Sequence, residues 1–138
     1  MKNLMLKSNR TRQIANMEKN KIKTIFNSAL NLHQNGNLKE AKILLKKILK
    51  ILPNHLPSIF LLGTLSAQIQ EFETAKKLLK QAIKIKPEFI AAHINLGNVF
   101  QELGKNQEAV SCYQRAIKLN PEYVEAHNNL GNVFQELG

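Results

Sequence analysis

Apolar residues recur at three- to five-residue spacing along most of the chain, which is the period of an amphipathic α-helix. The pattern begins at Thr11 and runs to Gly36 through positions such as Ile14, Ile22 and Ala29. Further helices are expected over residues 38–52, 56–69, 72–86, 90–103, 106–119 and 124–137. No segment alternates with the two-residue period of a strand, so the pattern predicts an all-α protein whose helices are joined by short connections.

The helical pattern also repeats along the chain. Residues of three kinds stand 34 positions apart: Gly63, Gly97 and Gly131; Pro53, Pro87 and Pro121; Ala41, Ala75 and Ala109. In this register the chain divides into a basic segment over 1–21, full copies over 22–55, 56–89 and 90–123, and a half copy over 124–138. A fixed period of this length is typical of stacked helix-turn-helix units that bury a shared core between neighbours.

Each repeated position has a physical reason. Glycine inside a helix costs roughly 1 kcal/mol relative to alanine, so Gly97 indicates that a second helix approaches closely there. Ala109 is a small residue on that second helix, and Tyr113 is a large one that fills the space between the two helices. Gly104 can adopt the positive φ of a helix C-cap, and Pro121 cannot continue a helix interior.

These residues resemble the tetratricopeptide repeat family. The matching positions in the best-preserved copy are Leu96, Gly97, Phe100, Gly104, Ala109, Tyr113, Ala116 and Pro121. The resemblance implies a right-handed α-solenoid of about three and a half repeats that serves as a scaffold for protein–protein interaction. The copies decay toward the N-terminus, where Ser66 and Gln70 replace the equivalents of Phe100 and Gly104.

In this family the first helix of each pair lines a concave groove. The positions carried over include Ala91 and Ile94 and a set of amides that we call the amide row: Asn95, Asn98, Gln101, Asn128, Asn129, Asn132 and Gln135. An amide donates and accepts at once, so such a row can bind the backbone of an extended peptide. The row is similar to the repeat region of protein O-GlcNAc transferases, although asparagine is also simply common in this chain. Leu61 interrupts the row and limits it to the C-terminal half.

The net charge of +10 is graded along the chain. Residues 1–21 carry +5, the three full copies carry +5, +2 and 0, and the half copy carries −2. Residues 1–10 are polar and basic, and we expect them to be frayed. Lys46, Lys50, Lys80 and Lys84 form a basic outer patch on the second helices, which is either a surface for nucleic acid or anionic membrane or an ordinary solvated face. Only three arginines are present, and no aromatic residues alternate with these lysines, so a nucleic-acid partner is disfavoured.

The sequence offers little for catalysis, metals or cofactors. Cys112 is the only cysteine and is expected to be buried or half-buried, and His93 and His127 lie one repeat apart, too far to share a metal. No nucleophile and base can be assembled, and no apolar run is long enough to span a membrane. We therefore expect a non-enzymatic, cytoplasmic protein with no metal and no cofactor. A carboxylate clamp for chaperone tails is also rejected, because Ala91, Asn95, Glu125 and Asn129 occupy the positions where cations would be needed.

The predicted function is a groove that binds an extended peptide or a partner helix. The alternative is the N-terminal substrate-recruiting arm of a larger transferase of the O-GlcNAc, sulfotransferase or methyltransferase type; a basic nucleic-acid or membrane-surface binder is a third class. The last helix copies an internal one, which favours a fragment of a longer protein. We expect it to leave an apolar face uncovered, with Leu130, Val133 and Phe134 as candidates, through which the chain could self-associate.

Overall fold

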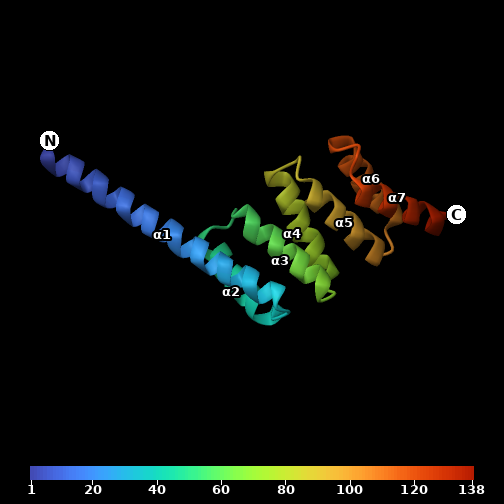
Figure 1. The fold of residues 1–138 in the computed structure, drawn as a ribbon, viewed down its shortest axis with the longest axis horizontal. Coiled ribbons are helices and arrows are strands. Elements are labelled where there is room, and N and C mark those ends of the chain that lie inside the picture. Colours follow the sequence, from blue (N-terminus) through green and yellow to red (C-terminus); the bar gives the residue numbers. More distant parts are fainter.

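The computed structural model describes all 138 residues as seven α-helices without a strand (Figure 1). Their bounds are α1 Lys2–Gln34, α2 Leu38–Ile51, α3 Leu56–Gln68, α4 Phe72–Ile85, α5 Ile90–Glu102, α6 Asn106–Leu119 and α7 Val124–Leu137. The predicted bounds of α2 to α7 agree with these to within one residue. The all-α solenoid expected from the 34-residue period is therefore confirmed.

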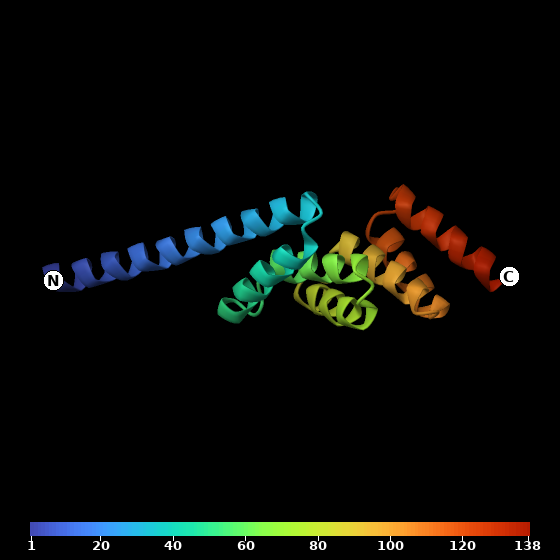
Figure 2. The same cartoon turned by 90° about the horizontal axis from the view of Figure 1, so that it is seen from below.

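The expectation that residues 1–10 are frayed is wrong. Helix α1 begins at Lys2 and extends away from the rest of the molecule as a single rod (Figures 1 and 2). The first 34 residues contain no Gly or Pro, and good helix formers such as Leu, Met and Lys are frequent among them. Every residue from Met1 to Lys21 is exposed, so this half of α1 packs on nothing, and the first buried side chain is Ile22.

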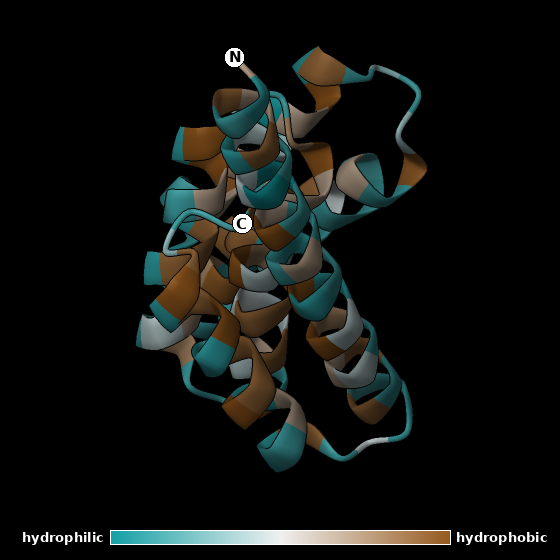
Figure 3. Ribbon diagram, turned by 90° about the vertical axis from the view of Figure 1, so that its left-hand side faces the viewer, coloured by the Kyte–Doolittle hydropathy of each residue, from teal (hydrophilic) through white to brown (hydrophobic).

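Helices α1 to α6 form three antiparallel hairpins that stack side by side, and α7 continues the stack (Figures 1 and 2). Each helix contacts the next one, and the first helices also contact one another along the row α1, α3, α5 and α7. Hydrophobic residues gather where the helices pack (Figure 3). Helices α1, α3, α5 and α7 therefore make one face of the array, and they position the candidate site.

Small residues set the spacing within each hairpin. Ala41, Ala75 and Ala109 are completely buried at equivalent positions of α2, α4 and α6. A Cβ atom added to Gly97 of α5 would lie 2.5 Å from Cε1 of Tyr113, which is itself fully buried on α6. The close approach predicted from Gly97 is thus confirmed, and the tyrosine ring is the group that makes glycine necessary.

The turns inside the hairpins need a left-handed residue after the first helix. Gly36 and Gly104 supply it with φ of 81° and 72°. Gln70 occupies the equivalent position after α3 with φ of 64°, and it is the only non-glycine residue with positive φ. A side chain in this conformation costs about 1–2 kcal/mol, so the second hairpin carries a strain that the third avoids.

Candidate functional site

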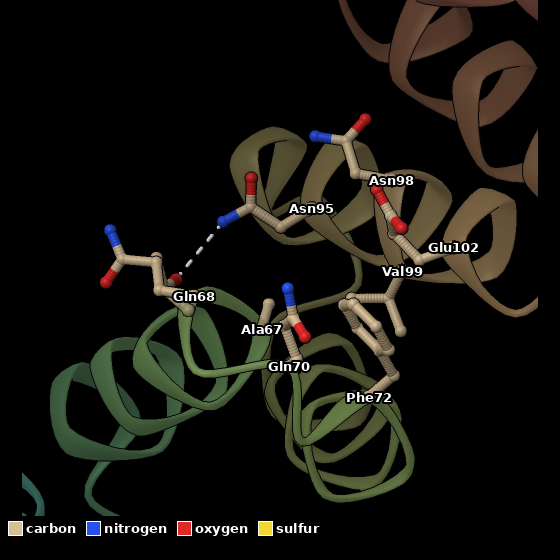
Figure 4. A pocket seen from close by; sticks show the side chains of 9 residues that line it. Ala67, Gln68, Gln70, Phe72, Asn95, Asn98, Val99 and Glu102 are labelled. Atoms are coloured by element: carbon tan, nitrogen blue, oxygen red, sulfur yellow. Dashed lines mark hydrogen bonds between the residues drawn. The ribbon is translucent and has the colours of Figure 1, made fainter.

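The candidate site is the face formed by the first helices, where the amide row lies. Between α3, the start of α4 and α5 this face has a hollow of about 360 Å³ (Figure 4). Six of its nine lining residues are polar, among them Asn95, Asn98 and Glu102, and Ala67, Phe72 and Val99 add apolar surface. The hollow is large enough to accept part of an extended chain.

Neighbouring first helices are joined through the amides. Asn95 on α5 donates from Nδ2 to Oγ1 of Thr64 on α3 at 3.2 Å (Figure 4). Asn129 on α7 donates from Nδ2 to Oδ1 of Asn98 on α5 at 3.0 Å. The two bonds are equivalent, because Thr64 and Asn98 are one repeat apart, as are Asn95 and Asn129. The amides therefore do not pair with the residue at the equivalent position of the next repeat. Each donates diagonally, to the residue three positions further along on the neighbouring first helix.

Tyr113 fixes the amides of α5 from beneath. Its hydroxyl lies 2.5 Å from Oδ1 of Asn98 and 2.5 Å from Oε1 of Gln101. A phenol has one hydrogen, so it donates to one of these oxygens at a time. Burial is the main cause that raises the pKa of Tyr113 above its usual range, and the hydroxyl therefore remains a neutral donor. Sequence reasoning assigned Tyr113 to packing alone and missed this second role.

The rest of the amide row is less organised. Asn128, Asn132 and Gln135 of α7 are exposed, and their side chains make no hydrogen bond. Ile94, which the family pattern places in the groove, is buried in the core instead. The structure thus brings together Asn95, Asn98, Gln101 and Asn129. It leaves Asn128, Asn132 and Gln135 at the open end of the array.

Two carboxylates lie at the α7 end of the groove. Glu102 and Glu136 line a second hollow together with Asn98 and Gln101. The ion pairs in the molecule are Lys42 with Glu71 and Lys76 with Glu73, so neither Glu102 nor Glu136 is paired. This end of the groove is therefore acidic, in keeping with the charge gradient along the chain.

The basic outer patch lies on α2 and α4, away from the amides. All four of its lysines are exposed. The Nζ atom of Lys80 lies 5.6 Å from the ring centre of Phe100, which gives this one lysine a cation–π contact. The patch has no carboxylate partner.

His93 and His127 hold the turns between repeats. Nε2 of His93 donates to the carbonyl oxygen of Pro87 at 2.7 Å, and Nε2 of His127 makes the same bond to Pro121 at 2.7 Å. Sequence reasoning rejected them as metal ligands and missed this role. No three His, Cys, Asp or Glu residues come together as metal ligands would. Cys112 is buried, as predicted, and burial raises the pKa of its thiol to about 11.

Comparisons with known proteins agree with this architecture. A family model described as "TPR repeat" matches residues 65–104 and 100–138, and one described as "Tetratricopeptide repeat" matches residues 22–55. The chain belongs to the tetratricopeptide repeat (TPR) family. Neither description is that of an enzyme, and a search of curated proteins gives no match.

Several solved structures are similar to this TPR chain. A crystal structure of MamA is 21% identical with a TM-score of 0.83, and the alignment covers 92% of this chain and 74% of MamA. The first TPR domain of Spaghetti (RPAP3), bound to the HSP90 peptide SRMEEVD, is 21% identical with a TM-score of 0.82 over 86% of this chain and 94% of that one. These two show the shared fold alone.

A third structure is an enzyme. A mutant O-GlcNAc transferase of Thermobaculum terrenum is 27% identical with a TM-score of 0.76, over 81% of this chain but 22% of the transferase. The chain thus resembles about a fifth of that enzyme. No helix of the TPR chain is both long and apolar enough to cross a membrane.

Proposed function

We propose that this TPR chain is a protein-interaction scaffold whose groove holds an extended segment of a partner protein by its backbone. The observation that carries the proposal is the fixed orientation of Asn98. Its Oδ1 accepts from Asn129 and lies within hydrogen-bond distance of the Tyr113 hydroxyl, so its NH₂ group is left to donate to a ligand. Asn95 and Asn129 each spend one N–H on a neighbouring helix and keep their Oδ1 atoms free to accept.

This arrangement suits a peptide backbone, which offers N–H and C=O groups at regular spacing. The amides are held in place before binding, so little side-chain entropy is lost when the ligand arrives. Backbone recognition is tolerant of the ligand's side chains. The Spaghetti domain, which is bound to a peptide, supports the class of function, although its ligand is not carried over to this chain.

The test compares two pairs of asparagines. Random peptides displayed on phage are selected on the intact chain, and the winning peptide is titrated calorimetrically into Asn95→Ala/Asn129→Ala. We expect loss of binding by about tenfold or more, because hydrogen bonds worth about 1 kcal/mol each are removed. The control is Asn31→Ala/Asn54→Ala, two exposed asparagines outside the amide row, which should bind normally. Equal affinity for all three proteins would reject the proposal.

Salt separates this function from nucleic-acid or membrane-surface binding. An amide site should change little in affinity between low and moderate salt, whereas a basic surface that binds phosphates loses affinity steeply.

A second candidate function is the substrate-recruiting arm of a larger transferase. The observation that favours it is the 27% identity to the O-GlcNAc transferase. Sequencing the native reading frame beyond residue 138 tests it. A transferase domain in the same frame would support this role, and a frame without one would reject it.

A further inference from the structure

The face formed by the first helices has a third hollow, which is apolar and which the amide row does not explain. It measures about 320 Å³ and lies between α1, α3 and the turn before α5. We call it the apolar socket; its main walls are Phe26 and Leu30 of α1, Phe60 and Leu61 of α3, and Phe89. Six of its eight lining residues are hydrophobic. A hollow of this size and lining suits one or two bulky apolar side chains rather than a polar ligand.

The aromatic walls are fixed by their neighbours. The rings of Phe60 and Phe89 are 4.5 Å apart, and Phe26 meets His55 edge-on at 5.8 Å. Phe26, Phe60 and Phe89 are nevertheless only half-buried, so apolar surface remains available at the socket. A ligand that covers it gains hydrophobic free energy without first rearranging the walls.

The rim of the socket is positively charged. Lys86 lines it and holds its Nζ atom 5.3 Å from the ring centre of Phe89. Lys23 lies one helical turn before Phe26 on α1 and is exposed. Neither lysine forms an ion pair. Glu88, in the same turn as Lys86, does not line the socket.

The socket and the hollow lined by Asn95 lie next to each other along α3. Leu61 lines the socket, and Thr64, one turn later on the same helix, lines the amide hollow and accepts the bond from Asn95. One extended ligand can therefore occupy both hollows.

We propose that the apolar socket anchors a bulky apolar side chain of the partner segment, and that acidic residues flank this side chain and face Lys86 and Lys23. The inference rests on the proposed function in that both sites would serve one segment on the same face. It adds a sequence preference that backbone recognition by amides does not supply.

The test uses three synthetic peptides with blocked ends and a Ser–Gly background. The first carries one Phe between Glu residues, the second replaces Phe with Ser, and the third replaces the Glu residues with Lys. Each is titrated into the chain labelled with 13C at its methyl groups and with 15N at its amides, and followed by NMR. We expect the first peptide to bind about tenfold more tightly than either of the others and to shift the methyl signals of Leu30 and Leu61.

Charge reversal at the rim gives a matched pair of variants. Lys86→Glu should remove the preference for the Glu peptide over the Lys peptide. Lys84→Glu makes the same change of charge two residues earlier, on an exposed side chain that does not line the socket, and should keep the preference. Both lysines are exposed, so neither change threatens the fold.

Three results would overturn the inference: no binding, equal binding of the three peptides, or the same methyl shifts on concentrating the chain alone, which would place a second copy in the socket. The proposed function fails separately. If Asn95→Ala/Asn129→Ala binds the first peptide with unchanged affinity and the same shifts at the socket, the proposed binding by the amides is rejected and the socket proposal stands. If the shifts are confined to the amide signals of Asn95, Asn98 and Asn129, the socket proposal is rejected and binding by the amides stands.

Discussion

Helices α5 and α7 carry the same nine-residue sequence, 96–104 and 130–138, in different surroundings. In α5 the side chain of Phe100 is 7% exposed, whereas its copy Phe134 in α7 is 50% exposed. Leu103 is half-buried and Leu137 is 50% exposed. A Cβ atom on Gly97 would collide with Tyr113, and one on Gly131 would meet nothing within 4 Å. Equal residues thus have unequal roles, because α6 covers one face of α5 and no helix covers that face of α7.

The other face of the two helices is alike. Val99 and Val133 are both no more than 1% exposed, since each faces the repeat before it. The expectation that Val133 belongs to the uncovered face of α7 is therefore wrong, while Phe134 does lie there and Leu137 was missed. In this array one side of a first helix is buried by the preceding repeat, and the other side is buried by the second helix of its own hairpin.

The largest expected difference between the two helices is the loss of stability when each phenylalanine is replaced by alanine. Phe100→Ala should lower the free energy of unfolding by about 3–5 kcal/mol, the usual cost of a buried phenylalanine. Phe134→Ala should cost less than about 1 kcal/mol, because much of this ring is already in water. Urea unfolding followed by circular dichroism measures both, and equal losses would mean that α7 is covered in solution.

Helix α7 would be covered in solution if the chain self-associates through it. The unfolding of Phe134→Ala is therefore measured at low and at high protein concentration, with sedimentation on the same samples. A loss of stability that grows with concentration would show that a second copy covers Phe134.

Smaller effects on the free energy of unfolding are expected at the two glycines, and the two substitutions should differ in sign. Gly97→Ala should destabilise by about 1–3 kcal/mol because the new methyl group overlaps the Tyr113 ring. Gly131→Ala should stabilise α7 by up to about 1 kcal/mol, since alanine favours the helix and the space is open. Hydrogen exchange of the amides in α5 and α7 resolves the two changes. Destabilisation by both substitutions would contradict the difference in packing.

The smallest effect concerns the turns after α3 and α5. Gln70→Gly should raise stability by up to about 1 kcal/mol by relieving a positive φ, less the entropy that glycine adds to the unfolded chain. Gly104→Gln is the reciprocal change and should lower stability by a similar amount. Thermal unfolding of both variants checks the pair, and a loss of stability in Gln70→Gly would show that the Gln70 side chain contributes more than its backbone strain costs.

Much of the fold could be predicted from the sequence because the repeat makes each local signal appear several times. Equivalent residues stand one repeat away from Gly97, Ala109 and Pro121. The assignment of the helices therefore did not depend on any single residue. The extent of α1 could not be predicted in this way. Its first half has no equivalent in the repeat and no partner, and only the absence of Gly and Pro pointed to a continuous helix.

The site was less predictable than the fold. The family pattern located Asn95, Asn98 and Asn129 on neighbouring first helices, but their diagonal bonds depend on the offset between helices, which no sequence period states. Tyr113 was assigned to the core because aromatic residues at helical spacing usually pack, and its hydroxyl reaches the amides only through the depth of the hairpin. The apolar socket joins residues from three separate segments, so it appears only when the chain is folded.

The rod formed by the first half of α1 has an electrostatic consequence. At 1.5 Å per residue, Arg10 lies about 18 Å along the axis from Ile22, and Lys2 and Lys7 lie farther out. The Debye length at physiological ionic strength is about 8 Å, so the field of these three cations is almost extinguished before it reaches the groove. The salt response of a groove ligand therefore reports nearby charges such as Lys23, Lys86, Glu102 and Glu136. The high net charge of the whole chain is a poor guide to what the groove attracts.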